Sequence, residues 1–237
     1  MWKPRRVRRA GRRRISGWWL AALVFLVGVA VTVGVVVFVT HRPVTPARSA
    51  ELLDRLPVVD RSTSDDSYRR AAFGESWADL DSDGCNTRDE VLLATVDRSS
   101  SYRTQRQGRC RADMVAGTWT DLYTGTPMTW SNLKDPVQAQ GIPIDHIVSL
   151  AGAYRYGAKN WSEGRRVEFA NDELNLTPTT AVLNRAKTDH DPASWTPPPA
   201  GRCAYATRYI AVKSRYDLPV DTEEKAALQR LLDSCPA

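Results

Sequence analysis

The pattern of apolar and polar positions divides the chain into a basic start, one long apolar run and a mixed remainder. Residues 18–39 carry no charged side chain, and a helix needs about 20 apolar residues to cross a bilayer. We therefore predict a transmembrane anchor over residues 18–40, after a basic arm over residues 1–17. The first 14 residues hold eight Lys and Arg and no acid, so the positive-inside rule places the N-terminus in the cytoplasm and the rest outside.

A cleavable signal peptide is the alternative for this apolar run. Its apolar core is usually shorter, about 7 to 15 residues, so an uncleaved single-pass anchor in the cell membrane is preferred. Small residues at 45–50 still offer a cleavage site, and cleavage there predicts a secreted protein.

Beyond the apolar run, helical and strand-like patterns are mixed, which predicts an α+β fold. Residues 41–65 are rich in Pro, Ser and Thr and are predicted to be a linker. The folded domain is predicted to span residues 66–237. The predicted elements are a short helix around 49–56, short strands within 117–130, a strand over 142–148, two helices within 149–172 with a break near 157–161, and helices over 180–189 and 221–235.

The net charge of +6 does not by itself indicate a basic nucleic-acid-binding domain. Eight of the 33 Lys and Arg residues lie in the first 14 positions. The rest of the chain therefore has 25 Lys and Arg residues and 27 Asp and Glu residues. The pI of about 9.3 therefore reflects the basic arm. Any contact with nucleic acid has to come from local patches of charge.

The four cysteines all lie on the predicted outer side of the membrane. An even number of cysteines in an exported domain favours disulfides, and three pairings are possible. We prefer the local pairing, Cys85 with Cys110 and Cys203 with Cys235. A zinc site is the weaker alternative, because the chain has no C-x-x-C pair.

An acid and a histidine stand side by side within the predicted strand over 142–148. Asp145 and His146 are flanked by Ile144 and Ile147. One interpretation is a buried strand whose histidine is hydrogen-bonded and inert. The other is a general base beside a carboxylate that ligates a metal ion. An Asp-His pair alone favours the first interpretation.

The downstream sequence changes this balance. The segments "DHIV", "NLTPTT" and "LNRAKTD" follow in order at residues 145–189. They resemble the HNH, or ββα-metal, endonuclease motif, and the chain from about residue 52 onward is similar to small exported bacterial nucleases of that family. The resemblance implies a ββα-metal (HNH) core embellished with helices and short strands, preceded here by the one predicted transmembrane helix.

The resemblance also assigns roles to four residues. His146 is expected to take a proton from the attacking water, as a neutral imidazole can. Asp145 and Asn184 are expected to hold one Mg²⁺ or Mn²⁺ ion through oxygen atoms, which hard cations prefer. Asn175 is expected to hold the loop and orient His146. The substrate that the resemblance implies is nucleic acid, and specifically DNA, cut to leave 5′-phosphate and 3′-hydroxyl ends.

Two features complicate this assignment. Adjacent residues of a regular strand point to opposite faces, so Asp145 and His146 can share a site only if the strand ends or bulges there. In addition, Ser149 stands where family members often have Pro, which we expect to alter the strand exit more than the chemistry.

Basic side chains near the motif are candidate phosphate contacts. Arg185 and Lys187 follow Asn184 on the predicted helix, and Arg88 is a third candidate. The alternative for Arg185 and Lys187 is an exposed, solvated face, and Asn184 itself is open to the same interpretation. His190 is interpreted as part of a helix end and not as a ligand.

A second motif, "DLDSDGCNTRDE" at residues 79–90, fits the pattern of a calcium-binding loop. Its candidate ligands are Asp79, Asp81, Asp83 and Glu90. Against calcium, Asn86 occupies a position that is usually aliphatic, and Cys85 is expected in a disulfide. The alternative is a tight acidic turn in front of a helix.

These observations predict an exported, membrane-anchored, metal-dependent endonuclease of the HNH class. One rival is a calcium-stabilised, non-catalytic binding module at the cell surface, and another is a structural envelope protein. The complete set of Asp145, His146, Asn175 and Asn184 argues against the first rival, and an in-gel nuclease assay would separate the second. The expected partners are nucleic acid and, through the N-terminal helix, the membrane; the sequence does not define the oligomeric state.

Overall fold

The computed structural model describes residues 45–61 and 67–236. The basic arm and the predicted anchor over residues 18–40 lie outside these residues. Among the helices that are described, none combines the length and the apolar character that crossing a bilayer requires.

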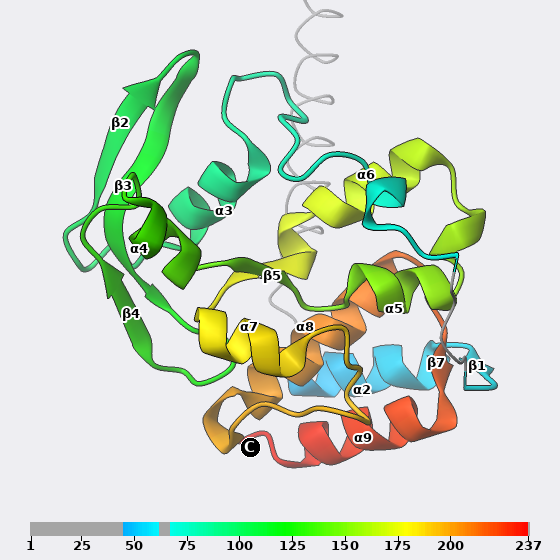
Figure 1. Cartoon of the computed structure of the whole chain (residues 1–237). Helices are drawn as coiled ribbons and strands as arrows, with labels where there is room; N and C mark the ends of the chain where they lie inside the picture. The colour runs from blue at the N-terminus through cyan, green and yellow to red at the C-terminus, as the bar shows by residue number, and fades with distance from the viewer. Residues whose placement is uncertain (1–44, 62–66, 237) are drawn as a thin grey trace, which may run out of the picture. The chain divides into compact units, whose positions relative to one another are not determined.

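The described residues form a mixed α and β unit, in agreement with the predicted α+β class (Figure 1). The helices are α2 (Pro46–Arg55), α3 (Thr87–Thr95), α4 (Pro136–Gly141), α5 (Leu150–Arg155), α6 (Glu163–Asn171), α7 (Ala181–Lys187), α8 (Arg202–Arg215) and α9 (Thr222–Asp233). The strands are β1 (Val58–Val59), β2 (Arg103–Gln107), β3 (Cys110–Thr120), β4 (Pro127–Trp130), β5 (Ile144–His146), β6 (Leu176–Pro178) and β7 (Val220–Asp221). Short 3-10 turns are η1 (Arg70–Phe73), η2 (Ala158–Asn160), η3 (Glu173–Asn175) and η4 (Pro199–Gly201).

Within residues 45–61 and 67–236 the strands form three small sheets. Strands β2, β3 and β4 make an antiparallel sheet in that order, β5 pairs antiparallel with β6, and β1 pairs parallel with β7. In the β5–β6 pair, Asp145 lies opposite Thr177 and His146 lies opposite Leu176. This two-stranded ribbon carries Asp145 and His146 and places them beside the segment that follows Asn175.

Helix α2 belongs to the folded unit, although the sequence places it in a linker. Its apolar residue Leu53 is fully buried, and Leu56 just after the helix is also buried. Both join Ile210 of α8 and Leu228 of α9 in one hydrophobic cluster, and the three helices lie together in Figure 1. The Pro- and Ser-rich composition around the helix led to the linker prediction, although the helix has this apolar face.

A second hydrophobic cluster forms where α3 covers the β2–β3–β4 sheet. Trp119 of β3 is fully buried, and its Nε1 donates a hydrogen bond to the carbonyl oxygen of Leu92 at 2.8 Å. Ile144 of β5 and Leu176 of β6 belong to this cluster, whereas Ile147, just after β5, belongs to the helical one. The β5–β6 ribbon is therefore held between the two cores, which fixes its position.

The helix that follows β6 is shorter than predicted. The Thr180 side chain accepts a hydrogen bond from the backbone N–H of Leu183 and begins α7, as an N-cap does. The helix ends at Lys187, because Thr188 adopts a positive φ of 49° that a helix cannot continue through. Strand β5 is also shorter than predicted and ends at His146.

Both disulfides have the predicted local pairing. Cys85 is bonded to Cys110 and Cys203 to Cys235, and the described residues contain no free cysteine. The second bond joins the start of α8 to the residues just after α9, so it closes the helical core at its edge.

We expect replacement of Cys203 and Cys235 by serine to lower the free energy of unfolding by about 2–5 kcal/mol, the usual effect of losing a disulfide from an exported domain. Urea denaturation of the double variant and the parent protein measures this difference. Addition of dithiothreitol should destabilise the parent further than the variant, because only the parent has two bonds to lose. An unchanged unfolding midpoint in the variant would contradict a structural role for the bond.

Candidate active site

Strand β5 ends at a cleft with a volume of about 590 Å³. The cleft contains three of the four residues that the sequence assigns to the motif: Asp145, His146 and Asn184. The other residues that line it are Tyr68, Arg70, Ile144, Ser149, Leu150, Ala151, Arg155, Thr188 and Asp189. The predicted base and the two predicted metal ligands therefore border one space.

The His146 imidazole is held on two sides. Its ring stacks on Trp77 with centroids 6.2 Å apart and an interplanar angle of 6°. Its Nε2 lies 2.8 Å from the carbonyl oxygen of Ala170, the penultimate residue of α6. A carbonyl oxygen can only accept, so Nε2 carries the hydrogen, and Nδ1 of the neutral ring is left with a lone pair.

The environment keeps this ring uncharged near neutral pH. Burial lowers the pKa of the His146 imidazole to about 4, and the Ala170 carbonyl and the Asp145 charge oppose this shift only in part. A buried ring that is held neutral, with one nitrogen committed as a donor, has the protonation state that a general base requires.

Asp145 is held by a different set of contacts. Its Oδ2 accepts a hydrogen bond from the Tyr123 hydroxyl at 2.5 Å and is paired with the Lys187 ammonium at 3.0 Å. Burial, followed by the negative charge of Asp145, raises the pKa of the Tyr123 hydroxyl well above its ordinary value. Tyr123 therefore stays protonated and donates to the carboxylate.

The end of β5 resolves the difficulty posed by adjacent residues on a strand. Asp145 points toward Tyr123 and α7, whereas His146 points toward Trp77 and α6. Because the strand stops at His146, both side chains still border the same cleft.

Asn175 fixes the segment that leaves β5. Its Oδ1 accepts from the backbone N–H of Val148 at 2.8 Å, and its Nδ2 donates to the carbonyl oxygen of the same residue at 3.1 Å. Its own carbonyl accepts from the N–H of Ile147 at 2.8 Å. Asn175 thus acts on the backbone after His146, and the contacts that hold the ring come from Trp77 and Ala170.

The candidate phosphate contacts lie in three different environments. Lys187 is fully buried and donates to the carbonyl oxygen of His146 at 2.8 Å in addition to its pairing with Asp145. This differs from the expected surface position, because the short helix α7 turns this side chain inward. Arg185 is exposed. Arg88 is partly buried and donates to the Ala139 carbonyl at 3.2 Å, facing α4.

Two arginines that sequence analysis missed do line the cleft. Arg70 is exposed in η1, and Arg155 at the end of α5 forms an ion pair with Asp189 at 3.0 Å. Trp77 was also missed. These residues lie outside the motif segments, and it is folding that brings η1, distant in the sequence, to the end of β5.

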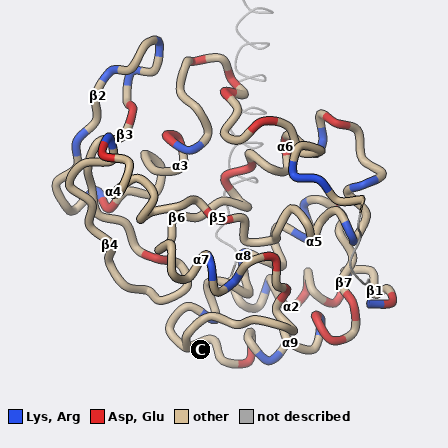
Figure 2. Tube along the Cα trace, viewed as in Figure 1, with Lys and Arg blue, Asp and Glu red and all other residues tan. Residues whose placement is uncertain are grey.

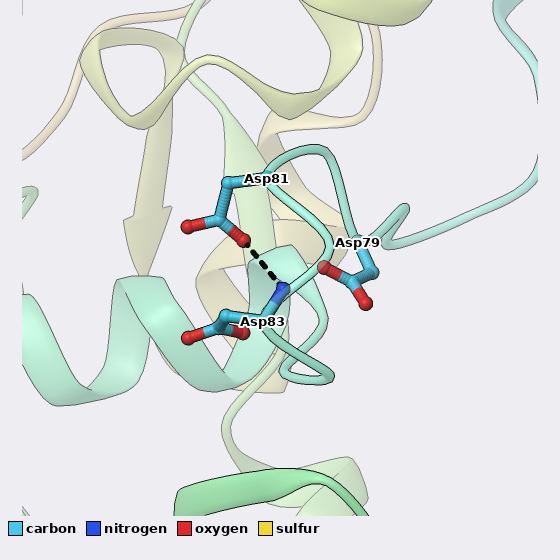
Figure 3. A group of neighbouring side chains, drawn as sticks. All are labelled: Asp79, Asp81 and Asp83. Atoms are coloured by element: carbon cyan, nitrogen blue, oxygen red, sulfur yellow. Dashed lines mark hydrogen bonds between the residues drawn. The ribbon is translucent and has the colours of Figure 1, made fainter.

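The acidic loop gathers three of its four candidate ligands (Figure 3). The carboxylate oxygens of Asp79, Asp81 and Asp83 lie within 4.8 Å of one another. Each accepts a backbone N–H of the loop: Asp79 from Gly84, Asp81 from Asp83, and Asp83 from Cys85. Glu90 on α3 lies outside this group, although burial and the charges of Asp81 and Asp83 raise its pKa. The calcium assignment therefore stays a prediction of the motif.

The family model described as the C-terminal domain of GmrSD restriction endonucleases matches residues 86–231. The chain belongs to this family. The matched segment includes Asp145, His146, Asn175 and Asn184, and its description indicates a nuclease-type function.

A second comparison identifies a relative over nearly the whole chain. A protein of Arthroderma benhamiae, described as an uncharacterized secreted protein, is 37% identical over 216 residues, which cover 87% of this chain and 97% of the relative. This relative is fungal, so it gives no support to the bacterial origin that the sequence resemblance suggested. No solved structure matches the chain.

We expect Lys187→Met to lower the free energy of unfolding by about 3–5 kcal/mol, because it leaves the Asp145 carboxylate buried without its cation. Urea denaturation without divalent metal measures this change. Arg185→Met on the exposed face of the same helix is the control and should change stability by less than about 0.5 kcal/mol. Asp145→Asn should recover part of the loss when it is combined with Lys187→Met. An equal loss from Lys187→Met in both backgrounds would contradict the coupling.

If the acidic loop binds calcium, Ca²⁺ at about 100 times its Kd should add about 2.7 kcal/mol to the free energy of unfolding. Asp81→Ala combined with Glu90→Gln should abolish this effect, and Asp233→Ala, an exposed acid of α9, should leave it intact. Melting curves in Ca²⁺ and in EGTA provide the measurement. Identical wild-type curves in the two solutions would favour a plain acidic turn.

Proposed function

We propose that this chain is a metal-dependent endonuclease of the HNH class that hydrolyses phosphodiester bonds of nucleic acid, with DNA as its substrate. In this proposal His146 is the general base, Asp145 and Asn184 hold one divalent ion, and Asn175 fixes the segment that carries His146. The observation that supports it most is the neutral, oriented His146 imidazole at a cleft that also contains Asp145 and Asn184.

The donor set of the cleft fits a hard divalent cation. A carboxylate oxygen and an amide oxygen suit Mg²⁺ or Mn²⁺, and Mg²⁺ is commonly held by one or two protein carboxylates with water and substrate phosphate completing the shell. The two donors on Asp145, Tyr123 and Lys187, both hold Oδ2, which leaves Oδ1 for a cation. A bound ion would supply neutralisation of charge on the scissile phosphate and on the leaving oxygen.

The chain's own groups account for the remaining steps. Nδ1 of His146 accepts a proton from the attacking water, and the Nε2 contact with the Ala170 carbonyl keeps Nδ1 free for the task. The stacked Trp77 ring limits rotation of the imidazole. Arg70 and Arg155 line the cleft, where their guanidinium groups can attract and position the phosphate backbone.

Action outside the cytoplasm is part of the proposal. The two disulfides suit an oxidising compartment, and the related fungal protein is described as secreted. Whether an N-terminal anchor holds this domain at the membrane rests on residues 18–40, which lie outside the described residues.

A non-catalytic, calcium-stabilised surface module is the second candidate. The cluster of Asp79, Asp81 and Asp83 favours it. It offers no account of a buried, neutral histidine beside Asp145, so the nuclease is preferred.

We expect His146→Ala to reduce plasmid cleavage by about 10² to 10⁴, the usual contribution of a general base. Asp145→Ala and Asn184→Ala should also abolish cleavage, but raised Mn²⁺ should partly restore it, because these changes weaken metal binding and leave the base in place. Asn175→Ala should be milder, since it removes a backbone contact and no reacting group. Nicking of supercoiled plasmid across a Mn²⁺ series separates these outcomes.

His190→Ala is the matched control, because His190 is exposed and lies beyond the end of α7. It should cleave like the parent protein, and melting curves should establish that every variant is folded. Cleavage by folded His146→Ala within a few-fold of the parent would show that this histidine is an inert strand residue.

A further inference from the structure

The strands β2 and β3 form a hairpin with an unusual charge. Residues 98–112, here called the arginine hairpin, contain five basic residues and no acid: Arg98, Arg103, Arg106, Arg109 and Arg111. All five are arginine. The rest of the chain after the basic arm has more acids than bases, so this hairpin is a local excess of positive charge, visible along β2 in Figure 2.

The hairpin presents this charge to solvent. All five residues of β2 are exposed, and β2 is the edge strand of its sheet, with β3 on one side only. In Figure 1 the hairpin projects away from the helices α2, α8 and α9. An edge strand with arginine and glutamine side chains resists pairing with another strand, which leaves the surface free for a different partner.

Three of the arginines are oriented without being neutralised. Arg103 donates to the Ser131 carbonyl at 2.9 Å, Arg98 to the Leu93 carbonyl at 3.1 Å, and Arg106 to the Gly108 carbonyl at 3.4 Å. Within residues 45–61 and 67–236, none of the three forms an ion pair. A carbonyl oxygen orients the guanidinium but does not neutralise its charge. Each of these three side chains therefore retains N–H donors for an anionic partner.

Arg109 and Arg111 differ from the other three arginines because they lie near acidic side chains. Arg109 lies 3.7 Å from an oxygen of Asp79, and Arg111 lines a cavity with Asp83 and Glu90. The available charge is therefore concentrated on Arg98, Arg103 and Arg106, toward the start of the hairpin and along β2.

The geometry points to the arginine hairpin as a binding surface for the phosphate backbone of nucleic acid, separate from the catalytic cleft. Guanidinium groups match phosphate oxygens in a bidentate geometry. The neighbouring Thr104, Gln105 and Gln107 add neutral donors of the kind that commonly contact phosphate and sugar. This surface would hold the substrate without reading its sequence.

An anionic membrane is the other polyanion to consider, and the side chains disfavour it. Segments that lie on a bilayer present apolar residues such as Trp, Phe and Leu on one face. The arginine hairpin exposes only Tyr102 among large hydrophobic side chains, and this ring lies under the Arg98 guanidinium at 5.8 Å. A surface of arginine, threonine and glutamine suits a hydrated, hydrogen-bonding partner.

The inference rests on the proposed nuclease function for its choice of partner, and its test measures binding apart from cleavage. The full chain is titrated with a short fluorescein-labelled DNA duplex in EDTA, and anisotropy is followed from about 50 to 200 mM salt. Arg103→Gln with Arg106→Gln should weaken binding and reduce the slope of log affinity against log salt by about 2, because each phosphate that a guanidinium neutralises adds roughly 0.9 to that slope.

The control removes the same charge elsewhere. Arg48→Gln with Arg55→Gln changes two exposed arginines on α2 and should leave the salt slope as it is in the parent. Equal effects from the two pairs would overturn the inference, because binding would then follow net charge alone. Unchanged duplex binding in the hairpin variant, with binding to phosphatidylglycerol vesicles abolished, would overturn it in favour of a membrane surface.

The outcomes also separate this inference from the nuclease proposal. If the hairpin variant loses duplex binding while the parent never cleaves plasmid with Mg²⁺ or Mn²⁺, the binding surface stands and the catalytic proposal fails. If the parent cleaves and the hairpin variant binds duplex with unchanged salt dependence, only the binding surface is wrong.

Discussion

The ammonium of Lys187 is the group on which the candidate site depends. It lies within 3.0 Å of Asp145 Oδ2 and 2.8 Å of the His146 carbonyl, so one charge contacts both residues of the pair on β5. Lys187 closes α7, the helix that also carries Asn184. The same interaction therefore holds the predicted carboxylate ligand and sets where the predicted amide ligand lies. Burying a lysine is costly unless its charge is paired, and here the pairing is with the residue whose position matters most.

Burial has opposite consequences for the two neighbours on β5. Removing His146 from water disfavours its charged form, and the ring stays neutral as a base must be. Asp145 is equally buried, but its carboxylate is paired with the Lys187 ammonium at 3.0 Å and accepts a hydrogen bond from the Tyr123 hydroxyl. The hydrophobic clusters on either side of the β5–β6 ribbon supply the low-polarity setting for both. The two residues differ in charge because their contacts differ. Asp145 contacts Lys187 and Tyr123 on one side of the strand, and His146 contacts Trp77 and Ala170 on the other.

How much the sequence could predict depended on whether a feature is local. The break between α5 and α6 and the local disulfide pairing were predicted, because each involves segments that are close in the sequence. The inward turn of Lys187 was not, because a basic residue near a helix end is usually solvated. The role of α2 in the core and the stacking of Trp77 on His146 depend on distant partners. The β2 strand escaped notice because its five exposed residues show no alternation of apolar and polar positions.

The distribution of charge separates two tasks that a nuclease has to combine. In the proposed mechanism the cleft holds an acidic metal ligand, Asp145, and this negative charge repels the phosphate backbone that has to enter. Arg70 and Arg155, which line the cleft, offset this repulsion only in part, because Arg155 is already paired with Asp189. Since the domain as a whole is nearly neutral, its long-range attraction for a polyanion is weak. In our proposal the projecting hairpin, through Arg98, Arg103 and Arg106, provides that attraction outside the cleft that contains Asp145. Affinity for the backbone then does not depend on the residues that the chemistry requires.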